Sequence, residues 1–178
     1  MGNASQRRSR TDGGSDAPWD RDKWDLEPDS VALALGVLAP PTMGKVMREA
    51  FYGARRFEDF HRRTGISLGV LSARLRELIS QGLLVKVPYQ EPNSRVREEY
   101  RLTDKGRDLI PTMVAMIDWA DRWLTSEKQP TVTLRHRGCG APVKAVLTCS
   151  LNHEIDAGHD IIASPGPGAL PCTGLPRS

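Results

Sequence analysis

Four residues near the carboxyl end have the types and spacing of zinc ligands. His136, Cys139, Cys149 and His153 form the pattern H-x2-C-x9-C-x3-H, in two close pairs. Imidazole nitrogen and thiolate sulfur are donors that zinc prefers. The pattern is either a degenerate site, in which packing holds a small β-element, or a zinc site that His153 completes.

The same residues do not form the pattern of an enzyme. Catalysis needs titratable groups that converge in a cleft, often around an activated nucleophile. Cys139 and His136 lie in a short C-terminal segment with no nucleophile signature around them, and the three cysteines all fall within the last 40 residues, which is too few for a disulfide framework. We therefore expect no catalytic activity.

Four arginines have a spacing that suits nucleic acid. Arg74 and Arg76 form one pair, and Arg95 and Arg97 form another. A guanidinium group can fork onto phosphate or guanine. Both pairs belong to residues 43–107, which carry 14 Lys and Arg against 8 Asp and Glu, in a chain whose net charge is +3. Such a basic block is typical of a phosphate-binding module, although solvated surfaces also carry surpluses of this size.

The first arginine pair stands on a predicted helix that Ser67 caps. Apolar residues recur there in steps of three and four, within an arc of about 100°. They are Leu68, Leu71, Leu75, Leu78 and Ile79. The opposite side begins with small residues, which permit close approach by another molecule. The alternative is a plain surface helix.

The second arginine pair stands on a predicted β-hairpin. Apolar residues follow a period of two over 83–89 and return over 98–102. The polar tip between them, residues 90–97, contains the turn formers Pro92 and Asn93. A thin hairpin with arginines at its tip suits contacts with the minor groove or the DNA backbone.

Further helices are predicted on both sides of these two elements. Residues 30–38, with Asp29 or Ser30 as N-cap, are apolar nearly all round and predict a short buried helix that Pro40 and Pro41 end. Two more helices follow at 43–52 and 58–64, and Gly53 and Gly65 end them.

A long helix is predicted from Asp104 to about Leu124, with Thr103 as its cap. Its apolar residues cover an arc of about 220°, more than one core contact requires. We therefore expect it to pack on its own domain and on a second copy of the chain. Pro111 is expected to bend it.

This order of elements is that of a winged helix-turn-helix, a mainly α fold with one small β-hairpin. The residues also resemble the HxlR-type transcriptional regulators, over residues 29–124. The resemblance rests on the motifs RFEDF at 56–60, GIS at 65–67, LSARLREL at 71–78, GLL at 82–84, Tyr89, YRLTDKGR at 100–107 and DW at 118–119.

The resemblance implies a winged-helix repressor or activator that binds the double-stranded DNA of an operator and dimerises through its first and last helices. The residues expected to contact DNA are Arg55, Arg56, Ser67, Gly69, Val70, Ser72, Ala73, Arg74, Arg76, Asn93, Ser94, Arg95 and Arg97. Those expected at the dimer interface are Val31, Leu35, Met113, Met116, Trp119, Ala120 and Trp123.

The sequence departs from its relatives at two positions that matter for sensing. Many HxlR-type proteins have an oxidant-sensing cysteine near the first helix and a tryptophan before the second, where this chain has Asp29 and Thr42. A thiol switch of that kind is therefore not expected. The missing tryptophan leaves room either for simple repacking or for a pocket that takes a small apolar effector. The predicted pocket residues are Thr42, Met43, Val46 and Met116.

The C-terminal appendage departs from its relatives as well. In related chains a second cysteine often follows the equivalent of Cys149 by three positions, and here that residue is Asn152. His153 is offset by one from this position, and a strand would turn it to the other face. The appendage is therefore expected to be zinc-ribbon-like, with a ligand set that is either degenerate or completed by His153.

The predicted organisation has four parts. A flexible arm at 1–28, with Trp19 and Trp24 near its end, precedes a winged-helix domain at 29–127, an appendage at 128–164 and a tail at 165–178.

No stretch has the roughly 20 apolar residues of a membrane span, and the N-terminus does not resemble a signal peptide, so we expect a cytoplasmic protein with no membrane partner. The rival functions are a winged helix that binds protein and a zinc-dependent regulator.

Overall fold

The computed structural model describes residues 20–38, 40–92, 94–125, 130–156 and 158–172. They fall into two compact units, one at Ser30–Glu154 and the other combining residues 20–29 with residues 155–172. Trp19, which is predicted to lie near the end of the arm, is outside the described residues. These units divide the chain differently from the sequence analysis, because the predicted appendage is split between them.

The smaller unit is built around a short antiparallel pair. The strands β1 (Trp24–Asp25) and β4 (Leu170–Pro171) lie side by side, with Trp24 opposite Pro171. Two single-turn helices, η1 (Arg21–Lys23) and η2 (Gly158–Asp160), complete it. Part of the predicted arm is therefore paired with part of the predicted tail. This pairing is made by backbone hydrogen bonds, which the types of the side chains do not predict.

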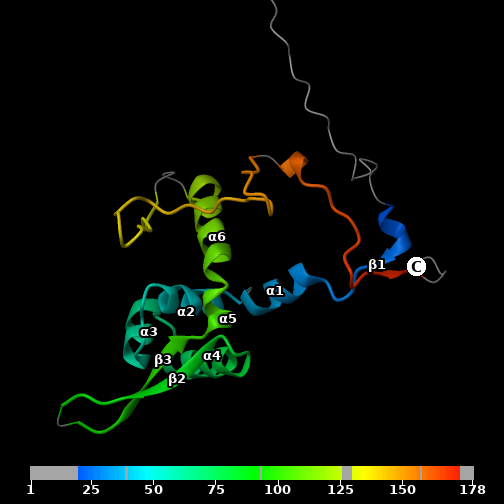
Figure 1. The fold of residues 1–178 in the computed structure, drawn as a ribbon. Helices are drawn as coiled ribbons and strands as arrows, with labels where there is room; N and C mark the ends of the chain where they lie inside the picture. The colour runs from blue at the N-terminus through cyan, green and yellow to red at the C-terminus, as the bar shows by residue number, and fades with distance from the viewer. Residues whose placement is uncertain (1–19, 39, 93, 126–129, 157, 173–178) are drawn as a thin grey trace, which may run out of the picture. The chain divides into compact units, whose positions relative to one another are not determined.

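The larger unit is mainly helical and has one hairpin (Figure 1). Its elements are α1 (Ser30–Leu38), α2 (Pro41–Phe51), α3 (Phe57–Thr64), α4 (Leu68–Ser80), β2 (Leu84–Tyr89), β3 (Arg97–Leu102), α5 (Asp104–Arg107) and α6 (Ile110–Trp123). The strands pair in antiparallel register from Leu84 opposite Leu102 to Tyr89 opposite Arg97. Figure 1 shows the β2–β3 hairpin, hereafter the wing, extending beyond the helices.

The core of this unit lies between α2, α3, α4 and the base of the wing. Burial of large apolar side chains supplies most of the favourable free energy of folding. Phe60 on α3 is fully buried and meets the ring of Tyr100 edge-on at 5.9 Å. The other fully buried side chains are Met43, Val46, Met47, Leu71, Leu75, Leu78 and Leu84.

The turn between α3 and α4 follows the prediction at Gly65 and departs from it at Ser67 and Leu68. Gly65 ends α3 with a φ of +66°, a backbone conformation that glycine adopts at no steric cost. Ser67 is the residue before α4, but its side chain caps no backbone amide. Leu68, predicted to face the core, is 58% exposed, because it lies in the first turn of α4, ahead of the part that the core covers.

Two helix predictions are wrong. The helix α1 is not buried against the described residues of the chain, since Val31 is 67% and Leu35 is 54% exposed. The long helix is in fact two helices, with a break after Arg107. Pro111 stands in the first turn of α6, where the missing N–H costs nothing, rather than inside a continuous helix. Thr103 caps α5 as predicted, accepting a hydrogen bond from the Gly106 amide at 3.1 Å.

Among the described residues, no single helix is long and apolar enough to cross a membrane; only α1 and α2 taken together, a sharply bent pair, reach the required length and composition.

Candidate nucleic-acid interface

The N-terminal half of α4 exposes a face of small side chains. Ser67 and Gly69 are exposed, and Val70 is 41% exposed. Ser72 and Ala73 are half-buried beside them. The free amides of a helix N-terminus carry a partial positive charge, which attracts phosphate. This face therefore permits a close approach by a polyanion.

The two arginines of α4 differ in their availability. The guanidinium of Arg74 pairs with the carboxylate of Glu77 on the same helix, and its Nε atom is buried without a partner. Arg76 is exposed, and its Nε atom only approaches the carbonyl oxygen of Ser72, at 3.4 Å. Arg76 can therefore turn toward a ligand at little cost, whereas Arg74 must leave Glu77.

The tip of the wing presents two unpaired cations. Arg95 and Arg97 are exposed, and neither has an ion-pair partner in the part of the chain that the structure describes. Ser94 shapes the turn, because its hydroxyl donates to the carbonyl oxygen of Glu91 at 3.0 Å. Asn93, also predicted to contact DNA, lies outside the described residues. Free guanidinium groups on a thin hairpin are well placed to bind phosphates.

Arg55 and Arg56 are held by acids of the wing. The Nη1 atom of Arg55 lies 3.6 Å from a carboxylate oxygen of Glu99. The guanidinium of Arg56 pairs with Glu91 and stacks 4.9 Å from the ring centroid of Tyr89. The hydrogen bond to Glu91 raises the pKa of Arg56 above its ordinary value. These partners lie more than 30 residues from the arginines, so residue spacing does not predict them.

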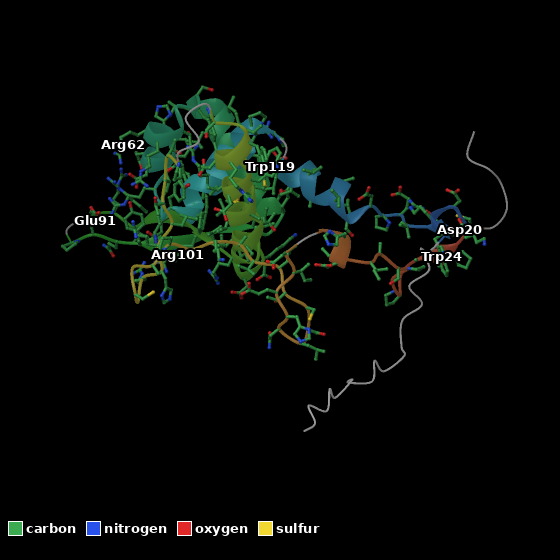
Figure 2. The ribbon with its side chains drawn as sticks, turned by 90° about the horizontal axis from the view of Figure 1, so that it is seen from above. Asp20, Trp24, Arg62, Glu91, Arg101 and Trp119 are labelled. Carbon is green, nitrogen blue, oxygen red and sulfur yellow. The ribbon has the colours of Figure 1, made fainter. Side chains whose placement is uncertain are left out.

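The residues predicted for a dimer interface are mostly accessible. Met116, Trp119 and Trp123 on α6 are between 51% and 71% exposed, and only Val114 of this helix is buried. Met113 and Ala120 are half-buried. Figure 2 shows Trp119 on α6, with the labelled residue Glu91 far out along the wing and Arg101 closer to the helices.

The predicted effector pocket is only partly matched by the structure. A hollow of about 310 Å³ lies between α2 and α6, and Met116 is the one predicted residue that lines it. Met43 and Val46 are fully buried in the core instead, because the turns of α2 direct them toward α3 and α4. The lining is formed by Leu38, Gly44, Lys45, Arg48, Met113, Met116, Ile117 and Ala120.

The predicted zinc ligands stand in two separate turns. The Nδ1 atom of His136 lies 3.3 Å from the sulfur of Cys139, in a turn closed by the Arg135–Pro142 bridge. Cys149 and His153 belong to a second turn, in which the Cys149 amide donates to the His153 carbonyl oxygen at 3.1 Å. Among the described residues, no group of three or more His, Cys, Asp or Glu side chains is placed to hold a metal ion.

Similar proteins share this arrangement of helices and wing. The pattern of the HxlR-like helix-turn-helix family matches residues 43–128. HTH-type transcriptional regulators of Mycobacterium bovis and Mycobacterium tuberculosis are each 38% identical to the chain over 143 residues, which is 80% of this chain and 89% of theirs. The chain belongs to the HxlR-like helix-turn-helix family. This is a family of DNA-binding transcriptional regulators, as the resemblance predicted.

Solved structures extend the likeness beyond the family pattern. The crystal structure of PA1607, a candidate transcription factor, is 32% identical with a TM-score of 0.68, and the match covers 79% of this chain and 97% of PA1607. A second one, PA1374 from Pseudomonas aeruginosa, is 27% identical with a TM-score of 0.53 and covers 79% of this chain and 94% of its own. The fold of this chain is therefore similar to that of two solved structures described as transcription factors.

Proposed function

We propose that this HxlR-like chain binds a specific operator sequence as a homodimer and represses transcription there. The recognition helix α4 enters the major groove with its small N-terminal face, and the wing reaches the adjacent backbone or minor groove. The observation that carries this proposal is the pair of exposed, unpaired guanidinium groups of Arg95 and Arg97 beyond the helices. A protein-binding winged helix would instead favour an apolar α4 face and an acidic wing.

The homodimer is supported by large apolar side chains that stand exposed on two helices of the described chain. Val31 and Leu35 on α1, and Trp119 and Trp123 on α6, each have more than half of their surface exposed. Large apolar side chains exposed on a helix face are typical of an interaction site. A two-fold dimer also matches the symmetry of a palindromic operator.

An effector that releases the operator is the second part of the proposal. The hollow between α2 and α6 is mostly apolar and adjoins Met116, which stands on the face of α6 proposed for dimerisation. A small apolar molecule bound there would alter the packing of α6 and thereby the spacing of the two recognition helices. The substitution Ile117→Trp fills the hollow from a residue outside the expected dimer interface, and it is expected to abolish release while operator binding persists.

Operator binding is tested with a labelled duplex from the region upstream of the gene, across a salt series. We expect nanomolar binding that exceeds binding to random-sequence DNA and weakens steeply with salt. Arg95→Ala should weaken it strongly, and Arg74→Ala less so because Arg74 pairs with Glu77. Equal affinity for random DNA, together with no site enriched from a random-sequence library, would contradict the proposal and favour a protein partner.

A further inference from the structure

The short segment before α3 is joined to the wing by four contacts. The backbone amide of Tyr100 donates to the carbonyl oxygen of Arg55 at 2.7 Å. The side chain of Arg55 faces Glu99, and the next residue, Arg56, pairs with Glu91 and stacks on Tyr89. Two consecutive residues of the helix-turn-helix thus hold both strands of the wing.

Glu99 is the buried anchor of this arrangement. Only 11% of its side chain is exposed, and a buried carboxylate is costly unless cations and hydrogen bonds compensate its charge. Besides Arg55, the Nε and Nη2 atoms of Arg101 approach the same oxygen at 2.6 and 2.5 Å. The position of Glu99 is therefore tightly defined, and it fixes β3 against the segment before α3.

The outer end of the arrangement lies next to the wing tip. Tyr89 pairs with Arg97 in the strand register, and Glu91 accepts the turn-forming hydrogen bond from Ser94. Arg56 is in this way connected to the part of the wing that carries the two unpaired arginines. A hairpin of only two strands is marginally stable by itself, so its direction depends on such contacts.

We propose that Arg55, Arg56, Tyr89, Glu91 and Glu99 form a wing clamp, whose role in DNA binding is to aim Arg95 and Arg97 at the DNA. This inference rests on the proposed function and revises the sequence-based prediction that Arg55 and Arg56 contact DNA. Arg55 and Arg56 act as positioning residues instead of phosphate contacts, because their guanidinium groups are engaged by Glu99 and Glu91.

Variants that remove acidic side chains of the clamp distinguish a positioning role from simple electrostatic attraction, because the two predict opposite changes in DNA affinity. Glu91→Gln with Glu99→Gln removes two negative charges, and this raised net charge by itself strengthens attraction to DNA. If the two acids position the wing, the same double variant binds DNA more weakly. Phosphate contacts do not depend on sequence, so random-sequence duplex DNA at low salt serves as the probe.

The clamp predicts that the effect of the two glutamine substitutions on DNA binding depends on Arg95 and Arg97. We expect the double glutamine variant to bind the duplex about tenfold more weakly than the parent protein. In a background that carries Arg95→Ala and Arg97→Ala, the two glutamines should no longer weaken binding, because no wing arginines remain to be aimed. Additive losses in both backgrounds, or tighter binding in the first, would overturn the inference while leaving DNA binding intact.

A matched control and a DNA-independent readout complete the test. Glu98 is the exposed neighbour of Glu99, pairs with Lys86 at 2.6 Å and points to the other face of β3, so Glu98→Gln should not weaken binding. Without DNA, trypsin should cut after Arg95 and Arg97 several-fold faster when the clamp is broken. Unchanged cleavage would refute the clamp. A parent protein that binds no duplex at all would instead refute the proposed function.

Folding of the variants is checked independently. Glutamine keeps the shape and one acceptor oxygen of glutamate, and thermal unfolding reports whether the core survives. Should Glu99→Gln fail to fold, Glu91→Gln alone is decisive, because Glu91 is half exposed and away from the core. Its expected result is weaker binding than the parent in the presence of Arg95 and Arg97, and unchanged or tighter binding would overturn the inference.

Discussion

Gly106 lies against the backbone of Leu83 so closely that no side chain fits between them. A Cβ atom on Gly106 would stand 2.2 Å from the carbonyl oxygen of Leu83, well below any normal contact. The same oxygen accepts a hydrogen bond from the Thr103 amide at 3.1 Å. This contact fixes the start of α5 on the residue that precedes β2, and so joins the base of the wing to the last helices.

Gly106→Ala is therefore expected to destabilise the protein by about 3 kcal/mol or more, since the backbone must move to admit the methyl group. Urea unfolding followed by circular dichroism measures the change. The control is Gly69→Ala on α4, where an added Cβ meets nothing within 4 Å and should stabilise the helix by about 0.5–1 kcal/mol. Equal effects at both positions would contradict the packing described.

Removal of the wing arginines should reduce both affinity and salt dependence. We expect Arg95→Ala and Arg97→Ala each to lower the slope of log K against log salt by about 1, because each guanidinium neutralises about one phosphate. Fluorescence anisotropy with a labelled duplex gives both quantities. Arg137→Ala, an exposed arginine of the C-terminal turns, serves as the control and should leave the slope unchanged.

Charge placed on the exposed apolar faces should break the proposed dimer. Trp123→Asp and Val31→Asp each bury a carboxylate if these residues lie between two subunits, and burial of an unpaired charge is strongly unfavourable. Sedimentation velocity should then show monomers at micromolar concentration. Leu151→Asp alters an equally exposed residue outside both helices and should leave the assembly unchanged. Dimers that persist in both α-helix variants would place the interface elsewhere.

Stability should fall at alkaline pH because of two half-buried phenols, those of Tyr52 and Tyr100. Burial raises the pKa of Tyr100 and of Tyr52 above the ordinary value of 10.0, so above about pH 10 the unfolded chain loses these protons before the folded chain does. The folded state then binds more protons, and the free energy of unfolding decreases as pH rises. Tyr100→Phe should flatten this decrease in urea titrations between pH 9 and about 11, and an unchanged slope would exclude Tyr100 as its source.

Chelation of metal should leave the fold intact. His136 and Cys139 supply two donors in one turn, and no third donor of the described residues joins them. We therefore expect the same thermal midpoint with and without a strong zinc chelator. One equivalent of zinc by elemental analysis, together with a lower midpoint in chelator, would show that Cys149 and His153 complete the site in solution.

Local sequence determined the elements of the winged helix, whereas only the tertiary structure decided how they are joined. The spacing of Leu71, Leu75 and Leu78 predicts α4, the period of two predicts the wing, and Gly65 marks the turn between α3 and α4, because each signal depends on residues close in sequence. The family motifs predicted the DNA-binding role for the same reason.

The exposure of α1, the β1–β4 pairing and the partners of Arg55 and Arg56 did not follow from the sequence. The apolar side chains on all sides of α1 indicate that the helix is buried. They do not indicate whether it packs against its own chain or against a second copy. Arg55 meets Glu99 only because the backbone brings the segment before α3 beside β3. Ion pairs between residues far apart in sequence depend on how the backbone folds, and the spacing of residues along the sequence does not predict which of them meet.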